Sequence, residues 1–206
     1  MGLGERCRLR KRDLSGIRKM KTRKPLKITS RSSSITNAFV QAIIPYRQPR
    51  EQDVDVALSK LGMSRDTIEC IYCGNNSTDW DHLFALVKNK RPSGFFSDIG
   101  NMVPACGPCN QSKSGQDWKA WMLGNAKNSP TTRGVTDVAE RIRILEKHIK
   151  TSGLRAKNIE DYIDNSELEE YWNSLEEIHS AMSKAQNLAS RIQSQLQSRL
   201  ELEKLL

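Results

Sequence analysis

Apolar residues recur at helical spacing in several stretches of the chain, and segments rich in glycine, proline and polar residues separate these stretches. Apolar side chains three and four residues apart form one face of an amphipathic helix. This pattern predicts a helix over 35–46, closed by Pro45, and a second helix over 54–61. It predicts a third helix over 135–150, after a linker, and a helical turn within 158–164. We therefore expect helices on both sides of the central region.

The C-terminal stretch has the longest regular pattern. From Ser166, a predicted N-cap with Glu169 three residues later, we expect one helix that runs to the end of the chain. Its apolar positions alternate by three and four residues, as in the seam of a coiled coil: Leu168, Tyr171, Leu175, Ile178, Met182, Ala185, Ala189, Ile192 and Leu196. Three interpretations remain open. This face packs back on the 135–150 helix, joins a second copy in a homodimer, or docks a partner protein.

The positive charge of the chain is concentrated at its N-terminal end. The formal net charge is +9, yet residues 1–50 carry 14 Lys or Arg against only Glu5 and Asp13, so the remainder is slightly acidic. A hydrophobic content of 37% indicates a small core, in which a structural metal contributes directly to folding. A basic arm on a nearly neutral body indicates a polyanion partner.

Residues 1–34 are rich in Arg and Lys, then in Ser, so we expect a basic arm that is disordered on its own. One interpretation is a solubilising tail or a targeting leader. The other is an arm that lies along phosphates, with nucleic-acid contacts at Arg8, Arg10, Lys11 and Arg12. The sequence has no apolar run near the roughly 18 residues of a membrane span. We therefore expect a soluble, cytoplasmic protein with no membrane partner.

Four of the five cysteines form two Cys-x-x-Cys pairs, Cys70 with Cys73 and Cys106 with Cys109. Each pair makes a tight turn that directs two thiolates at one ion, and two such turns are the ligand set of a tetrahedral, structural Zn²⁺ site. Paired spacing of this kind fits a reducing compartment rather than disulfides. The 32 residues between the pairs are more than a compact zinc finger holds, so zinc would close a loop with content of its own. Cys7 is interpreted as an incidental thiol.

A second set of polar residues accompanies the cysteines. It consists of Asp81-His82 and Asn101 within the loop, Asn110 directly after the last cysteine, and Lys113. With the cysteines, this arrangement resembles the HNH nucleases with a ββα-metal core, in the variant whose last motif residue is Asn. The resemblance covers about 45 of the 206 residues. It implies an α+β fold, in which a small zinc-clipped nuclease core is flanked by helices and followed by a long C-terminal helical segment.

The resemblance also suggests a division of the chain. After the basic arm we expect a helical N-terminal segment over 35–64, the nuclease core over 65–124 and a helical region over 125–206. The elements expected within the core are strands over 67–71, around 79–83 and near 101–103, and one helix from just past Cys109 to about Leu123.

In this family the polar residues have distinct roles. Neighbours on a strand point to opposite faces, so Asp81 and His82 cannot share one role. The resemblance implies that His82 is the general base that activates water for in-line attack on phosphorus. Asp81 and Asn110 are the implied oxygen ligands of a catalytic Mg²⁺ or similar divalent cation. Asn101 belongs to the catalytic set as a residue that orients the loop or the base.

Further nucleic-acid contacts are expected at Lys88, Lys90 and Arg91, and Lys113 is either a phosphate contact or a cation on the helix surface. The leading hypothesis is a metal-dependent endonuclease that cuts DNA in restriction or anti-phage defence, with a mobile-element nuclease next. Two alternatives remain. One is a zinc-stabilised nucleic-acid-binding module without activity, and the other is a nuclease subunit controlled by a partner protein on the C-terminal helix.

Overall fold

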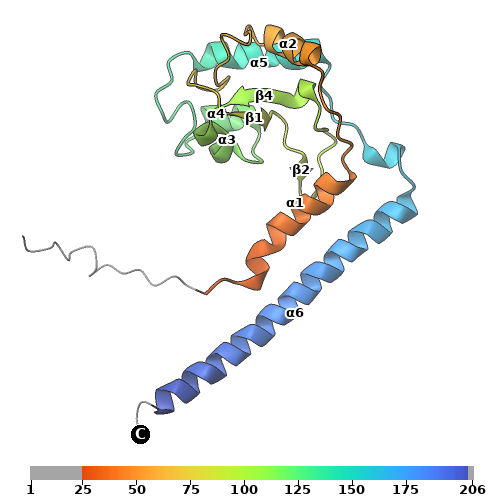
Figure 1. Cartoon of the computed structure of the whole chain (residues 1–206), viewed down its shortest axis with the longest axis vertical. Coiled ribbons are helices and arrows are strands. Elements are labelled where there is room, and N and C mark those ends of the chain that lie inside the picture. The colour runs from red at the N-terminus through yellow and green to blue at the C-terminus, as the bar shows by residue number, and fades with distance from the viewer. Residues whose placement is uncertain (1–24, 204–206) are drawn as a thin grey trace, which may run out of the picture.

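The computed structural model describes residues 25–203, and the expected arm contacts Arg8, Arg10, Lys11 and Arg12 lie outside the described residues. The fold is α+β, as expected, with short strands among many helices. Figure 1 shows a rounded head, which contains the helices α2 to α5 and the strands β1 and β4, and a handle formed by α1 and the long helix α6.

The described chain begins with a 3-10 turn, η2 (Ile28–Arg31), which leads directly into α1 (Ser32–Ile43). η2 lies wholly, and α1 partly, within the stretch 1–34 that we expected to be disordered on its own, so residues 28–34 are helical in the structure. The reason is a tertiary contact. The backbone N–H of Ile28 donates to Oε1 of Gln186, far along α6, at 2.6 Å. The helix α2 (Glu51–Lys60) follows, as predicted.

The strands form two small antiparallel pairs. β1 (Asp79–His82) pairs with β4 (Met102–Ala105), and both strands were expected. β2 (Val87–Lys88) and β3 (Arg91–Pro92) form a hairpin, and η3 (Ile99–Asn101) precedes β4. The strand expected over 67–71 is reduced to one isolated bridge between Glu69 and Asn76. The chain closes the first cysteine turn at this point and cannot remain extended.

The single helix expected after Cys109 consists of two helices, α3 (Gly107–Lys113) and α4 (Trp118–Leu123). Ser114 has a φ of +48°, outside the helical region, and therefore ends α3. The carboxylate of Asp117 then caps α4 by accepting a hydrogen bond from the backbone N–H of Ala120 at 2.8 Å. This break turns the face of α4 that carries two buried tryptophans toward the core.

The C-terminal part contains α5 (Val138–Ser152), a 3-10 turn η4 (Ile159–Asp161) and α6 (Asn165–Glu203). α6 begins where expected, but with a different cap. The carboxylate of Asp164 accepts a hydrogen bond from the backbone N–H of Ser166 at 2.8 Å. Ser166 itself therefore lies within the first turn of the helix.

The larger hydrophobic cluster surrounds the four cysteines and fills the head. Tyr72, Val103 and Trp121 belong to it, and α5 contributes Ile142 and Leu145. α5 thus packs with the expected core, although the sequence division placed it beyond residue 124.

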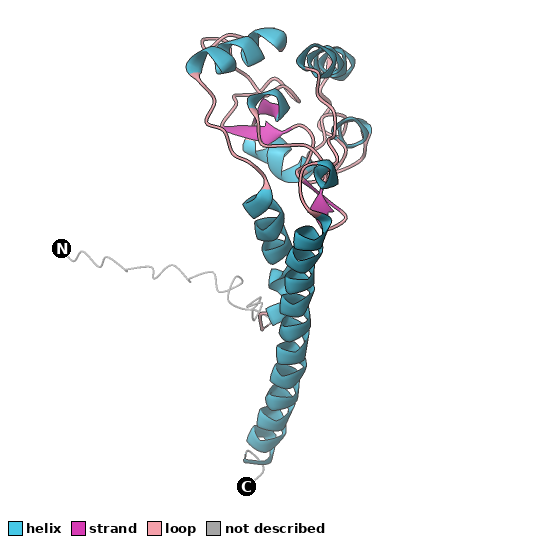
Figure 2. Cartoon of the chain, turned by 90° about the vertical axis from the view of Figure 1, so that its right-hand side faces the viewer, coloured by secondary structure: helices cyan, strands magenta, loops and turns pink. Residues whose placement is uncertain are grey.

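The second cluster joins α1 to α6. Val40 of α1 and Ile44, the residue after α1, pack against Leu168, Trp172 and Leu175 of α6, and the two helices lie side by side in both views (Figure 1 and Figure 2). The interpretation in which α6 packs back on α5 is therefore wrong, because the apolar face of α5 is occupied by the head and that of α6 by α1.

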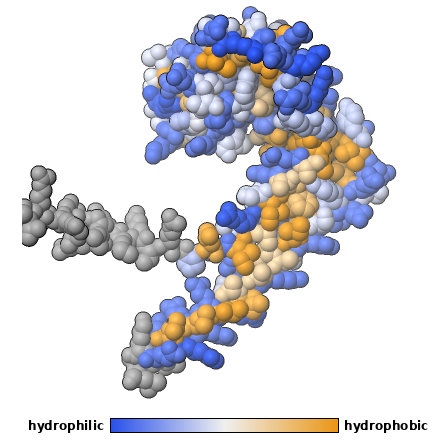
Figure 3. Space-filling view, viewed as in Figure 1, coloured by the Kyte–Doolittle hydropathy of each residue, from blue (hydrophilic) through white to orange (hydrophobic). Residues whose placement is uncertain are grey.

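The helix α6 extends beyond its contacts with α1 and η2, and Figure 3 shows apolar residues along this part of the handle. They include Leu188, Ile192, Leu196 and Leu200, all of which are exposed. Among the described residues, 25–203, we find no helix with the length and apolar character that a membrane crossing requires.

Candidate functional site

The four paired cysteines come together in the head. The Sγ atoms of Cys70, Cys73, Cys106 and Cys109 all lie within 4.8 Å of one another. Those of Cys73 and Cys106 are 3.7 Å apart. A regular tetrahedron with Zn–S bonds of about 2.3 Å requires an S–S separation of about 3.8 Å. The predicted grouping is confirmed, and the cluster could hold a metal ion such as zinc.

Local backbone geometry forms the two cysteine turns. In the first turn the N–H groups of Cys73 and Gly74 both donate to the carbonyl of Cys70, at 3.3 and 2.8 Å. Gly74 has a φ of +73°, which glycine adopts without strain. In the second turn Cys106 precedes the first residue of α3, and Pro108 follows at a position where a helix needs no N–H donor.

The thiols of the cluster differ in acidity. A hydrogen bond with Cys109 lowers the pKa of the Cys70 thiol to about 5, whereas the same bond raises the pKa of Cys109 and burial raises the pKa of Cys73. In addition, Nη1 of Arg133 donates to Sγ of Cys109 at 3.4 Å. Since a metal binds the thiolate form, the low pKa of Cys70 and the contact of Arg133 suit a metal centre. Sequence reasoning did not identify Arg133, which lies in a turn-rich segment 24 residues after its partner.

A second arginine holds the first cysteine turn from α5. Nη1 of Arg141 donates to the carbonyls of Cys70 and Ile71, at 3.2 Å each, and to Glu69 at 3.0 Å. Its Nη2 pairs with Asp137 at 2.9 Å. The buried carbonyls of the turn are thus satisfied by a charged donor from another element.

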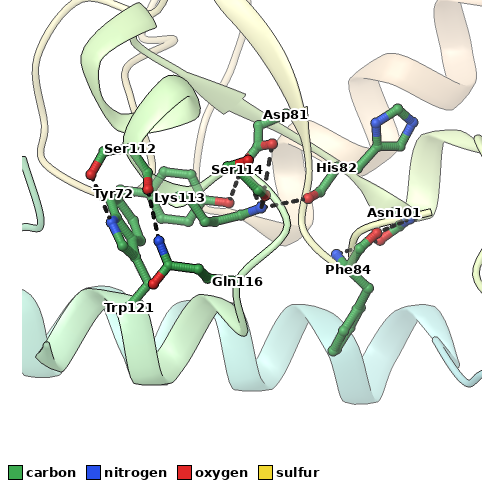
Figure 4. A network of polar contacts seen from close by, with 10 residues as sticks. All are labelled: Tyr72, Asp81, His82, Phe84, Asn101, Ser112, Lys113, Ser114, Gln116 and Trp121. Atoms are coloured by element: carbon green, nitrogen blue, oxygen red, sulfur yellow. Dashed lines mark hydrogen bonds and ion pairs between the residues drawn. The ribbon is translucent and has the colours of Figure 1, made fainter. Parts of the chain in front are cut away.

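Asp81, an expected ligand of the catalytic metal, lies buried between β1 and α3. Its Oδ2 is 3.1 Å from Nζ of Lys113 and accepts a hydrogen bond of 2.7 Å from the hydroxyl of Tyr72. Lys113 also donates to the backbone carbonyls of His82, at 2.9 Å, and Ser114, at 3.3 Å. Figure 4 shows the ammonium among these oxygens. Burial, together with the Asp81 carboxylate, raises the pKa of Tyr72 well above its ordinary value.

The position of Lys113 differs from both expectations for it. The side chain is 0% exposed, so it is neither a cation on the helix surface nor placed to contact phosphate. Its N–H groups are directed at protein oxygens, and its role in the described structure is to tie α3 to β1.

This ion pair also affects the expected site of the divalent cation. Asp81 lines a hollow of about 340 Å³, but its carboxylate is already compensated by Lys113. Asn110 is half-buried on α3, one turn before Lys113, and no hydrogen bond between described residues joins it to Asp81. The two expected ligands therefore do not present a free pair of oxygens. A divalent cation at Asp81 would have to share that carboxylate with Lys113 or displace it.

His82, the expected base, lines the same hollow and is half-buried. Its Nε2 lies 2.9 Å from Oγ of Ser97, which is the hydrogen-bond partner of the ring among the described residues. Burial lowers the pKa of His82 below its ordinary value, although the Asp81 carboxylate acts in the opposite direction. This shift favours the unprotonated imidazole, the form that a general base requires. Ser97 was not identified from the sequence, because no local pattern links it to a histidine 15 residues earlier.

Asn101 does not contact the ring of His82. Its Nδ2 donates to the carbonyls of Phe84 and Phe96, at 2.9 and 3.1 Å, and its Oδ1 accepts from the N–H of Phe84 at 2.9 Å. Asn101 was expected to orient either the loop or the base, and these contacts match orientation of the loop. The loop that it holds carries both His82 and Ser97 at its ends.

The expected nucleic-acid contacts of the central loop lie on the β2–β3 hairpin. Lys88 and Lys90 are exposed. Arg91 is half-buried, and its guanidinium carbon lies 4.7 Å from the ring centre of Trp172 in α6. Arg91 therefore helps to fix the hairpin against the handle through a cation–π contact.

Comparisons with known proteins add no relative. No protein-family model matches the chain, and neither a curated protein nor a solved structure matches it. The resemblance to HNH nucleases accordingly rests on the motif residues of the sequence.

Proposed function

We propose that this protein is an endonuclease of the HNH class that hydrolyses DNA phosphodiester bonds, with His82 as the general base. The observation that supports the proposal best is the setting of His82. A half-buried imidazole lies at the wall of a polar hollow, on a strand that packs against α3, the helix that carries Cys109. Such a base in a hollow beside a carboxylate is suited to activate water.

The surrounding residues hold this base in place. Ser97 contacts the ring at Nε2, and the tautomer in which Nε2–H donates to Ser97 leaves the other ring nitrogen to take a proton from water. Lys113 holds the backbone at His82 through its carbonyl, and Asn101 holds the loop that follows. A divalent cation, if bound by Asp81 and Asn110, would supply Lewis-acid stabilisation of the charge that develops on the phosphate. In the described structure Lys113 provides the positive charge beside Asp81.

The direct test is cleavage of supercoiled plasmid by the purified chain, with Mg²⁺ and with excess EDTA. His82→Ala should reduce the rate by about 10²–10⁴, the usual contribution of a general base, while the fold and metal content stay unchanged. Gln52→Ala, at an exposed position of α2, is the matched control and should cut like wild type. Cleavage by His82→Ala within tenfold of wild type would exclude the assignment.

Ser97 is proposed as a positioning residue for this base. Ser97→Ala should lower the cleavage rate less than His82→Ala does, and Ser97→Thr should restore it, because threonine keeps the hydroxyl that contacts Nε2. A purely structural role would predict that Ser97→Ala melts early with an unchanged rate per folded molecule. Thermal melts measured beside the rates separate the two.

A second candidate function is a nucleic-acid-binding module without activity. The observation that favours it is the ion pair between Asp81 and Lys113, which leaves the carboxylate without a free charge for a divalent cation. This candidate predicts that wild type binds DNA but does not cleave it with Mg²⁺, Mn²⁺ or Co²⁺, and that His82→Ala binds equally well.

A further inference from the structure

A second polar hollow adjoins the hollow that contains Asp81 and His82. The first encloses about 340 Å³ and the second about 410 Å³. Asn37 of α1 and Val87 of β2 line both, so the two hollows meet at these residues. Together they form a groove that runs from His82 between α1 and the β2–β3 hairpin and reaches His179 of α6.

One side of this groove is a row of polar side chains at four-residue spacing. Thr29 of η2 and Ser33, Asn37 and Gln41 of α1 all line it. Residues four apart lie on the same side of a helix. The adjacent stripe of α1 contains Thr36 and Val40, which are buried against α6 and fix the rotation of the helix. Because the buried stripe of α1 packs against α6, the polar row on the neighbouring side of α1 faces the groove.

The other walls supply positive charge and further donors. The hairpin contributes the exposed Lys90, which has a φ of +62°, and α6 contributes His179 and Ser183. Among the described residues that line the two hollows, the sole carboxylate is that of Asp81, and Lys113 neutralises it. The groove is thus rich in hydroxyl and amide groups and has no uncompensated negative charge within the part of the chain that is described.

These features suit a phosphate-containing strand. Most protein contacts to the nucleic-acid backbone come from Lys and Arg together with Ser, Thr, Asn and Gln side chains, which is the composition of this groove. The chain order adds a second argument. The residues that precede Pro25 include ten Lys or Arg, and this basic segment joins the described chain next to η2, at the end of the groove far from His82.

We propose that the groove holds one strand of the nucleic-acid substrate, with its backbone along the polar row of α1 and the scissile phosphate beside His82. The inference rests on the proposed nuclease function and extends it, because it assigns the substrate path to residues outside the HNH-like motif. Asn37 and Gln41 would contact the backbone next to the reacting phosphate, and Lys90 would contact a phosphate further along.

The test measures binding separately from cleavage. The full-length His82→Ala protein provides a background in which a fluorescein-labelled 20-mer can be titrated by anisotropy, as a single strand and as a duplex. In this background, removal of two neutral hydrogen bonds by Asn37→Ala with Gln41→Ala should weaken binding about tenfold and leave the salt slope unchanged. Lys90→Gln should instead lower the slope of log K against log salt by about 0.9 for duplex or 0.7 for a single strand.

Two exposed positions in the head provide matched controls. Gln52→Ala on α2 removes an amide, and Lys147→Gln on α5 removes a positive charge, and neither lines the groove. Groove variants that bind like these controls would overturn the proposed path while the nuclease assignment stands. If the His82→Ala parent binds neither oligonucleotide, the proposed function itself fails, and the path fails with it. A groove that instead receives a protein segment would give this last result.

Discussion

Lys113 and Asp81, 32 residues apart in the sequence, form a buried ion pair of 3.1 Å that joins α3 to β1. Charges removed from water are stable only when they are paired, and the loss of one partner leaves the other uncompensated. This relationship controls both the position of the strand that carries His82 and the availability of Asp81 for a divalent cation.

We therefore predict that Lys113→Met lowers the free energy of unfolding by about 3–5 kcal/mol. Lys113→Met combined with Asp81→Asn should recover part of that loss, because no unpaired charge remains. Urea unfolding of the two variants and of Lys147→Met, an exposed control, measures the effect. An exposed ion pair contributes roughly 1 kcal/mol or less to stability. If Lys113→Met lowers the free energy of unfolding by less than about 1 kcal/mol, the pair behaves as an exposed one and is in contact with water.

The cysteine cluster should govern folding rather than chemistry. Cys73→Ser or Cys106→Ser should lose the bound metal and the cooperative thermal transition together, because metal binding by a small core contributes folding free energy. Cys7→Ser, outside the Cys-x-x-Cys pairs, should change neither. Metal content and circular dichroism melts on the same samples provide the measurement. A metal-free Cys73→Ser protein that melts at the wild-type temperature contradicts a structural centre.

His148 on α5 should make the head sensitive to acid. The side chain is 0% exposed, its Nε2 lies 2.8 Å from the carbonyl of Gly100, and burial lowers its pKa, with a smaller contribution from Lys60. A histidine whose pKa is lower in the folded state stabilises the fold above its unfolded pKa of about 6.5, and this contribution is lost as the pH falls.

The loss amounts to at most about 1.4 kcal/mol per pH unit for one histidine. His148→Gln retains a donor for Gly100 without a titrating ring, and should show a shallower decline in unfolding free energy between pH 7 and pH 5. Parallel curves for wild type and variant would mean that the ring is hydrated.

The basic arm should set the salt dependence of DNA binding. Residues 1–24 contain ten Lys or Arg against two acidic residues. Since residues 28–34 belong to η2 and α1, removal of 1–24 is a cleaner change than removal of the whole predicted arm. If half of the ten cations meet phosphates, the slope of log K against log salt should fall by about 4–5 for duplex DNA. An arm with all ten replaced by Gln should behave like the deletion. An unchanged slope would indicate a solubilising or targeting segment.

The exposed part of α6 offers a test of self-association. Leu175 is 0% exposed against α1, so charge at that position would disrupt the handle itself. Ile192 and Leu196 are 48% and 56% exposed. Ile192→Asp with Leu196→Asp should convert a dimer to a monomer without a change in melting temperature, whereas Gln193→Asp on a neighbouring face should not. Sedimentation of the wild-type protein as a monomer at micromolar concentration would exclude a dimer formed through this apolar face of α6.

Features that depend on residues close together in the sequence could be predicted, whereas contacts between residues far apart in the sequence could not. The cysteine pairs, β1 and the course of α6 could be predicted because spacing and turn residues act within a few positions. The apolar stripe of α6 indicated a buried face but not its partner, since α1 and α5 are equally plausible from periodicity alone. Lys113 was expected as a phosphate contact or a surface cation, and not as a buried one, because its partners, Asp81 and the carbonyl of His82, lie some 30 residues away. Ser97 beside His82 and Arg141 beside Cys70 are hidden from sequence for the same reason.

The contact of Arg141 with the first cysteine turn also constrains how the protein is made. A chain emerges from the ribosome N-terminus first, so Cys70 is synthesised before Arg141 of α5, which lies 71 residues later in the sequence. Until α5 arrives, the carbonyls of Cys70 and Ile71 have no charged donor. A gene fragment that stops at residue 124 omits that donor permanently. A fragment that is designed to fold as the isolated head should therefore include α5 up to its end at Ser152.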